Sequence, residues 1–337
     1  MNADPGRWPR RLVTLPLLFA ATALLTATIV VWLPLSAVAA LLLPAARSAP
    51  RVLLFITAFA WCEVAGVLTA AWIWLRHGRP ATRDAAGRER WLAANYALQN
   101  WWCNALKRWA ERCFRLRFAV EGEDALAGSA PIMLLRHCSI GDTMIPVVFY
   151  AAARERRLRF VLKRELLFDP CLDIVGNRLP NYFADRSAQN TAREVDGVRA
   201  LAEDLPEDTG VLIYPEGTRY TREKRRAVLA ALERRGESAL VERAERWPNL
   251  LPPKPGGPLA LLGAGTGRDL VFGAHTGFEG SASFARLFNG SWLDTTVRIR
   301  FWRVPADEIP ADADGQRALL YSQWDRMSRD VDELAAR

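Results

Sequence analysis

Residues 131–143 read PIMLLRHCSIGDT, and this stretch decides how the rest of the chain is interpreted. The apolar run PIMLL predicts a buried strand, which places His137 at the end of that strand. Active groups of α/β sheets lie at such strand ends. Asp142 follows five positions later and can begin a helix predicted over 141–153. The stretch therefore predicts either a catalytic His–Asp pair or a polar turn in which Asp142 is an ordinary N-cap.

A contact between His137 and Asp142 requires a non-helical turn between them, because side chains five positions apart on a helix point to different faces. The intervening CSIG segment, 138–141, supplies such a turn if Gly141 adopts a positive φ. Asp142 would then fix the tautomer of the imidazole and leave its other nitrogen as a general base. Cys138, beside the histidine, is the alternative nucleophile.

Short apolar runs alternate with helical patterns from residue 114 onward. Strands are predicted at 115–122, 131–137, 159–166, 181–186, 210–217 and 295–304. Helices are predicted at 141–153, 187–205, 221–246 and 314–335. This alternation indicates an α/β layer fold, and we expect residues 114–337 to form one cytoplasmic domain.

Residues 1–80 are predicted to form an N-terminal membrane helical hairpin. No charged residue occurs from Leu12 to Ala46, and Glu63 is the only charge from Val52 to Leu75. Both segments reach the length of about 20 apolar residues that crosses a bilayer core. The first is too long for the apolar part of a signal peptide. Glu63 is expected to face the partner helix or water. The hairpin either spans the bilayer or re-enters one leaflet.

The charge pattern indicates how the chain meets the membrane. Arginines are more numerous outside the hairpin than in its loop, which predicts that both ends are cytoplasmic, in an inner membrane. Residues 88–113 predict an amphipathic linking helix that lies on the membrane surface or against the next domain. The net charge of +8 favours an anionic surface or ligand. The sequence has no nucleic-acid-binding fingerprint, and five cysteines without C-x-x-C argue against a metal site or a disulfide scaffold.

Two further stretches predict anion sites. In GVLIYPEGTRY (210–220), Gly217 lets the backbone approach a ligand, and Arg219 offers a bidentate fork to phosphate. The alternative is a plain turn after a strand. In LPNYFADRSAQN (179–190), Arg186 precedes a predicted helix N-terminus, which is a ready phosphate site. The alternative there is a solvated surface turn.

The order H-x4-D, Phe-x-Asp-Arg and Pro-Glu-Gly-Thr-Arg resembles the glycerolipid acyltransferases, specifically the lysophosphatidic acid (1-acylglycerol-3-phosphate) acyltransferases. Residues 160–170 resemble the family's Lys-x-Glu-Leu segment. Residues 249–262 and 287–310 are similar to the lysocardiolipin-acyltransferase-like branch. The resemblance spans about residues 115–310 and implies a mixed central sheet flanked by helices, as in glycerol-3-phosphate acyltransferase. Arg136 stands where the family often has Asn, and Pro180 where it usually has Gly, so these positions put the acceptor's identity in question.

The resemblance implies transfer of an acyl group from acyl-CoA or acyl-ACP to the free sn-2 hydroxyl of 1-acylglycerol-3-phosphate, without a cofactor or metal. His137 would be the general base and Asp142 its orienting partner. The implied substrate-binding residues are Lys163, which would donate to the oxyanion, Arg186, Glu216, Gly217, Thr218 and Arg219. The expected partners are lysophospholipid, acyl-CoA and the bilayer, with no nucleic acid and no obligate protein partner. The alternatives are a different acceptor, such as lysocardiolipin or lysophosphatidylglycerol, a transacylase, and, more distantly, a non-catalytic lipid-binding protein.

Overall fold

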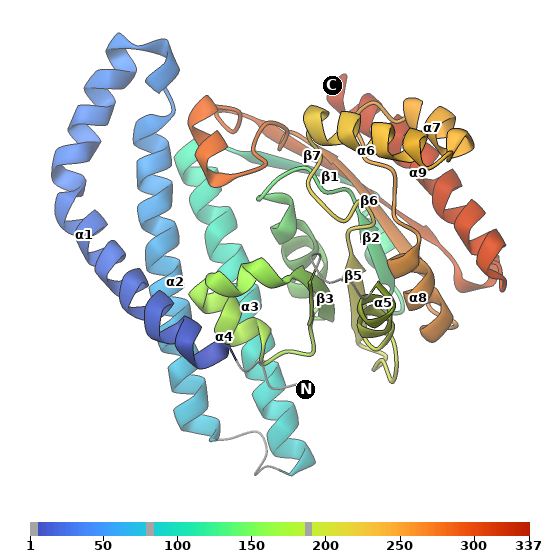
Figure 1. Ribbon diagram of the computed structural model, residues 1–337. Coiled ribbons are helices and arrows are strands. Elements are labelled where there is room, and N and C mark those ends of the chain that lie inside the picture. Colours follow the sequence, from blue (N-terminus) through green and yellow to red (C-terminus); the bar gives the residue numbers. More distant parts are fainter. Residues whose placement is uncertain (1–5, 79–83, 186–190) are drawn as a thin grey trace.

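The structure is a computed structural model that describes residues 6–78, 84–185 and 191–337. A seven-stranded sheet of order β1-β7-β6-β2-β5-β3-β4 forms the centre of its C-terminal part (Figure 1). The strands are β1 (Arg117–Glu121), β2 (Ile132–Leu135), β3 (Arg157–Lys163), β4 (Tyr182–Ala184), β5 (Thr209–Ile213), β6 (Leu270–Thr276) and β7 (Thr296–Val304). The six strands predicted from the sequence are all present.

The sheet is mixed, as expected. Strands β6, β2, β5, β3 and β4 are parallel to one another, whereas β7 is antiparallel to β6 and parallel to β1. The parallel strands bring their carboxyl ends to one edge, where ligands of α/β sheets bind. All four residues of β2 are buried, which explains the continuous apolar run in its sequence.

Helices cover the sheet on both sides (Figure 1). The helices of the described residues are α1 (Arg7–Leu42), α2 (Ala49–His77), α3 (Ala85–Phe114), α4 (Pro170–Gly176), α5 (Thr191–Arg199), α6 (Arg222–Arg234), α7 (Ser238–Glu245), α8 (Gly256–Ala264) and α9 (Ala313–Ala335), and α1 lies on the outer side of α2, away from the sheet (Figure 1). One apolar core joins α2 and α3 to one face of the sheet, and a second joins α5, α8 and α9 to the other face.

Several predicted elements differ from those observed. Strand β6 was missed, and the helix predicted over 221–246 is divided into α6 and α7 at Gly236, whose φ is +73°. The segment 141–153 forms a short 3-10 turn and then the π-helical segment η5 (Val147–Ala152), separated by Pro146. Pro146 has no N–H with which to continue the helical hydrogen bonds. The start of the helix predicted over 187–205 lies outside the described residues.

Helices α1 and α2 are long and apolar enough to cross a membrane. Helix α1 is exposed along most of its length, whereas half of the apolar part of α2 is buried against the rest of the protein. Glu63 of α2 is 1% exposed and accepts hydrogen bonds from Trp102 Nε1 of α3 at 2.8 Å and from Cys171 N of α4 at 3.0 Å. Glu63 therefore faces α3 and α4, and not the partner helix α1 of the hairpin or water, which the sequence predicts.

Both ends of α1 are attached to the sheet-containing part of the protein. At its start, Arg10 and Arg11 bind the buried carboxylate of Asp173 on α4, at 2.6 and 2.7 Å. Beyond its end, Ser48 Oγ donates to the carbonyl oxygen of Phe288 at 2.6 Å. The turn of the hairpin and its N-terminal end therefore both lie against the same globular part.

Candidate active site

The predicted turn after β2 brings His137 and Asp142 together. Residues 136–140 are non-helical, a 3-10 turn begins at Asp142, and His137 Nδ1 lies 2.9 Å from Asp142 Oδ1. Gly141 has a φ of −77°, so the turn forms without the positive φ that a glycine permits. A glycine is needed there because a Cβ atom would lie within 3 Å of the rings of Trp292 and Phe278.

Asp142 is held rigidly. It is 1% exposed, and its Oδ2 accepts hydrogen bonds from the backbone N–H groups of Cys138 at 2.6 Å and Ser139 at 2.8 Å. Burial acts to raise its pKa, but the neighbouring His137 and these hydrogen bonds lower the pKa of Asp142 below its ordinary value of 3.8. A charged carboxylate opposite Nδ1 keeps a proton on that nitrogen, which leaves Nε2 unprotonated.

Two residues that follow β5 fix the histidine from the other side. The rings of His137 and Tyr214 stack with centroids 4.3 Å apart. Glu216 Oε1 accepts the backbone N–H of His137 at 2.7 Å, and its Oε2 accepts that of Leu251 at 2.9 Å. Burial raises the pKa of Glu216 to about 8, although both hydrogen bonds act to lower it. Glu216 therefore connects three loops at the sheet edge.

His137 opens into a cavity of about 520 Å³. The wall nearest the hairpin is apolar and includes Phe55 and Phe59 of α2 and Trp102 of α3. Among the described residues, the cations that line the cavity are Lys163, Arg219 and Lys254. The carboxylates in the same lining are Asp169, Asp185 and Glu194. Its volume falls in the range of about 300–1,000 Å³ that is usual for ligand sites. The cavity suits an amphiphile that presents an anionic group and an apolar chain.

Comparison with known proteins shows what the part of the chain around this site is similar to. The acyltransferase family model matches residues 117–256, which include the His–Asp turn and the segment that follows β5. Residues 117–256 are therefore similar to acyltransferase domains, over less than half of the chain. Among curated proteins, none matches the sequence at a significant level.

The fold of the whole chain is also similar to a solved structure, the 1-acyl-sn-glycerophosphate (LPA) acyltransferase PlsC from Thermotoga maritima. The TM-score is 0.55 at 14% sequence identity, and the match covers 86% of this chain and 100% of that one. At this identity the likeness concerns the fold.

The predicted binding residues take different places around the acyltransferase site. Lys163 ends β3 and lines the cavity with Gly217 and Arg219. Gly217 has a φ of +68°, as a turn glycine requires, and Arg219 Nη1 donates to the carbonyl oxygen of Ala282 at 2.6 Å. Thr218 does not line the cavity, and its hydroxyl accepts from Lys224 Nζ at 3.0 Å. Arg186 lies outside the described residues.

The suggestion that Arg136 could alter contacts to the acceptor is not supported. Its side chain is 1% exposed and does not line the cavity. It binds Glu279 at 2.5 Å, the carbonyl oxygen of Asn249 at 3.0 Å and the carbonyl oxygen of His275. A buried guanidinium needs such partners, so Arg136 stabilises the loops behind the site.

Cys138 is poorly placed to be the nucleophile. Its side chain is buried outside the cavity lining, and burial raises the pKa of its thiol well above the ordinary value. A thiol must ionise to attack. The geometry thus favours direct use of the histidine over a covalent cysteine intermediate.

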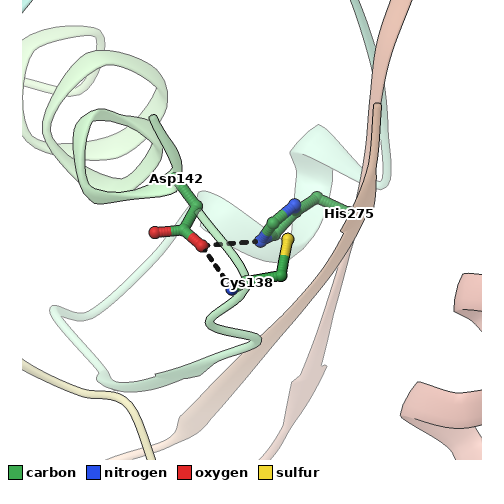
Figure 2. A group of neighbouring side chains, drawn as sticks. All are labelled: Cys138, Asp142 and His275. Carbon is green, nitrogen blue, oxygen red and sulfur yellow. Dashed lines mark hydrogen bonds and ion pairs between the residues drawn. The ribbon is translucent and has the colours of Figure 1, made fainter. Parts of the chain in front are cut away.

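A second histidine, His275, lies beside Asp142 and Cys138 (Figure 2). His275 of β6 places Nε2 at 3.6 Å from Asp142 Oδ2 and at 3.1 Å from the carbonyl oxygen of Arg136, close to Cys138. These three side chains have the types and proximity of metal ligands. However, the Asp142 carboxylate already accepts two amides and His137, and the buried Arg136 cation lies nearby. The group therefore fits an internal polar contact better than a metal site.

Sequence reasoning missed four contributors to the site: Tyr214, Lys254, His275 and the apolar wall from α2. Tyr214 lies within 210–220 and Lys254 within 249–262, two stretches in which other residues carried the prediction. The α2 wall could not be read from the sequence, because the pattern of an apolar helix is the same whether it faces lipid or a cavity.

Proposed function

We propose that the protein is an O-acyltransferase that moves a fatty acyl group from acyl-CoA to the sn-2 hydroxyl of 1-acylglycerol-3-phosphate. The observation that carries the proposal is the single cavity in which His137, three cations and an apolar wall from the hairpin meet. A lysophosphatidate has the matching groups: a hydroxyl, a phosphate and an acyl chain.

In this reaction, His137 Nε2 takes the proton of the acceptor hydroxyl as its oxygen attacks the thioester carbonyl. Asp142, 2.9 Å from Nδ1, stabilises the imidazolium that forms. Lys163, on the cavity wall, would donate to the oxyanion. The C–S bond then breaks, the ester forms, and the CoA thiolate leaves and receives the proton. The acceptor hydroxyl takes the place of a serine nucleophile, so no acyl-enzyme is needed.

The acceptor's phosphate is assigned to the cavity wall that contains Arg219 and Lys254. Lys254 approaches Gly217 closely: its Cε atom is 3.5 Å from the position that a Cβ atom of residue 217 would occupy. Arginine suits bidentate binding of phosphate and lysine acts as a point charge beside it. An acceptor without a charged phosphate monoester would use these groups less well.

The test compares acceptors in the purified protein and in Arg219→Ala. With acyl-CoA as donor, the wild type should acylate lysophosphatidate faster than lysophosphatidylglycerol or lysocardiolipin. Loss of a hydrogen bond to a charged group costs about 1.5–3 kcal/mol, so the KM for lysophosphatidate should rise about 10–100-fold in the variant. The KM for acyl-CoA should change little.

Arg222→Ala, an exposed arginine nearby on α6, is the control and should leave both KM values unchanged. An unchanged KM for lysophosphatidate in Arg219→Ala would refute the phosphate role. Faster acylation of lysocardiolipin would instead support the alternative acceptor.

We further propose that the hairpin enters one leaflet of the inner membrane from the cytoplasmic side. Helix α2 is about 43 Å long at 1.5 Å per residue, yet the domain contacts the turn at Ser48 and the opposite end through Asp173. A hairpin that crossed the bilayer would carry its turn away from the domain.

Cysteine labelling tests this orientation, because the five native cysteines are buried. Ala45→Cys in the turn and Asp314→Cys on exposed α9 are treated with a membrane-impermeant maleimide in sealed vesicles of both orientations. We expect Ala45→Cys never to be labelled from the face opposite to Asp314→Cys. Labelling from opposite faces would show that the hairpin spans the bilayer.

A further inference from the structure

A second hollow lies on the outer side of the hairpin. It is a groove of about 670 Å³ bounded by α1, α2 and α3, and it shares no lining residue with the catalytic cavity. Three tryptophans line it: Trp61 of α2, and Trp101 and Trp109 of α3, which are 50%, 40% and 39% exposed. Such partly exposed tryptophans are typical of the boundary between lipid and water.

One end of the groove is strongly basic. Arg51 of α2 lies there with Arg112 and Arg115 from the end of α3, and none of the described residues that line the groove is acidic. Asp294, outside the lining, is 3.9 Å from Arg51 and 3.2 Å from Arg115. Arg112 lies over the ring of Trp109, 5.7 Å from its centroid. These contacts provide one negative charge for three positive charges.

Arg51 is also incompletely satisfied. Its Nη1 atom is buried, but it has no hydrogen-bond partner among the described residues. An enclosed guanidinium nitrogen that lacks an acceptor is costly. An anion placed between Arg51 and Arg112 would supply that acceptor.

We propose that this groove binds an anionic membrane phospholipid. The lipid phosphate would lie among Arg51, Arg112 and Arg115, and an acyl chain would follow α2 towards Trp61. The lining on α2 runs from Arg51 to Ala65, which is about 21 Å at 1.5 Å per residue. Two of the three helices that form the groove, α1 and α2, have the length and composition of membrane helices, so membrane lipid would be within reach of the groove.

This lipid is a bound partner and not a substrate. The groove does not include His137 or any other residue of the catalytic cavity. Its position between α1, α2 and α3 means that an occupied groove would stabilise the packing of the hairpin on the acyltransferase domain. Binding should therefore raise the melting temperature as well as being measurable directly.

Native mass spectrometry of the full chain in neutral detergent tests the proposal. Phosphatidylglycerol and phosphatidylethanolamine with identical acyl chains are titrated separately. The wild type should bind phosphatidylglycerol about tenfold more tightly, the ratio that corresponds to about 1.4 kcal/mol, the lower end of a charge-assisted hydrogen bond. Arg51→Gln/Arg112→Gln should lose this preference and the accompanying rise in Tm.

Arg90→Gln is the matched control, because Arg90 is exposed on the same helix α3 and lies outside the groove lining. It should keep the wild-type preference, as should His137→Ala, which makes the result independent of catalysis. If the double variant does not fold, the single variant Arg112→Gln is used in its place, because Arg112 is exposed. Equal binding of the two lipids by the wild type, or an unchanged preference in the arginine variants, would overturn the proposal.

Discussion

Replacing His137 by alanine should lower kcat by about 10²–10⁴-fold, the usual contribution of a general base. The imidazole is the group that links the rigid Asp142 to the cavity, and the described structure offers no neighbouring base to replace it: His275 is buried behind Asp142. Release of CoA under saturating substrates measures kcat. The KM values should change little, because the apolar wall and the cations of the cavity remain.

Cys138→Ala is the control for this experiment. It removes the rival nucleophile but keeps the backbone N–H that Asp142 accepts, so we expect near wild-type activity. Loss of activity in Cys138→Ala together with a trapped acyl-cysteine would replace the direct mechanism with a covalent one. Full activity in His137→Ala would remove the histidine from the chemistry altogether.

Asp142→Asn should be the second most damaging change, with kcat lower by about 10²–10⁴-fold. Asparagine has a single acceptor oxygen, whereas Asp142 accepts from His137 and from the backbone N–H groups of Cys138 and Ser139. Either the turn loses a hydrogen bond or the imidazole takes the wrong tautomer. Each buried donor left unpaired costs about 1–3 kcal/mol, so the Tm should fall as well.

The pH dependence of the Tm isolates the contribution of Asp142 to stability from its contribution to kcat. The folded pKa of Asp142 is depressed, so its stabilising effect is present above its ordinary value of 3.8 and is lost as the pH falls through the lower, folded value. Asp142→Asn should lack this loss. Asp325→Asn is the control: Asp325 binds Arg243 and Trp247 away from the cavity, so its loss should lower the Tm and leave kcat unchanged. Wild-type kcat in Asp142→Asn would refute the orienting role.

The layers of the fold were predictable because the spacing of apolar residues and the positions of turn-forming residues are local properties of the sequence. Strand β2 and its polar exit could be recognised from PIMLLRH, and the helix 314–335 agrees with α9 to within one residue. Strand β6 was missed because LVFGAHT is a short apolar run without alternation, which periodicity cannot distinguish from buried helix. The strand order likewise depends on contacts between distant segments.

The parts of the site that lie within one short segment were predictable from the sequence. The parts that depend on contacts between distant segments were not. The spacing of His137 and Asp142 already required a non-helical turn, which the structure shows. The reason for Gly141 could not be foreseen, because Phe278 and Trp292 lie more than 130 positions further along the chain. The presence of Arg136 where the family often has Asn put the acceptor's identity in question, yet Glu279 and His275 enclose this side chain within the protein.

Helix α2 has a consequence for how a substrate reaches the histidine. Phe55 and Phe59 project from it into the catalytic cavity, while Leu54 and Trp61 on its other side are 39% and 50% exposed. A single helix, about 10 Å across, thus separates the reaction chamber from the lipid surface that the hairpin is suited to enter. An acyl chain that moves around α2 would pass from the apolar membrane interior to the apolar wall of the cavity. Its transfer would therefore involve almost no contact with water.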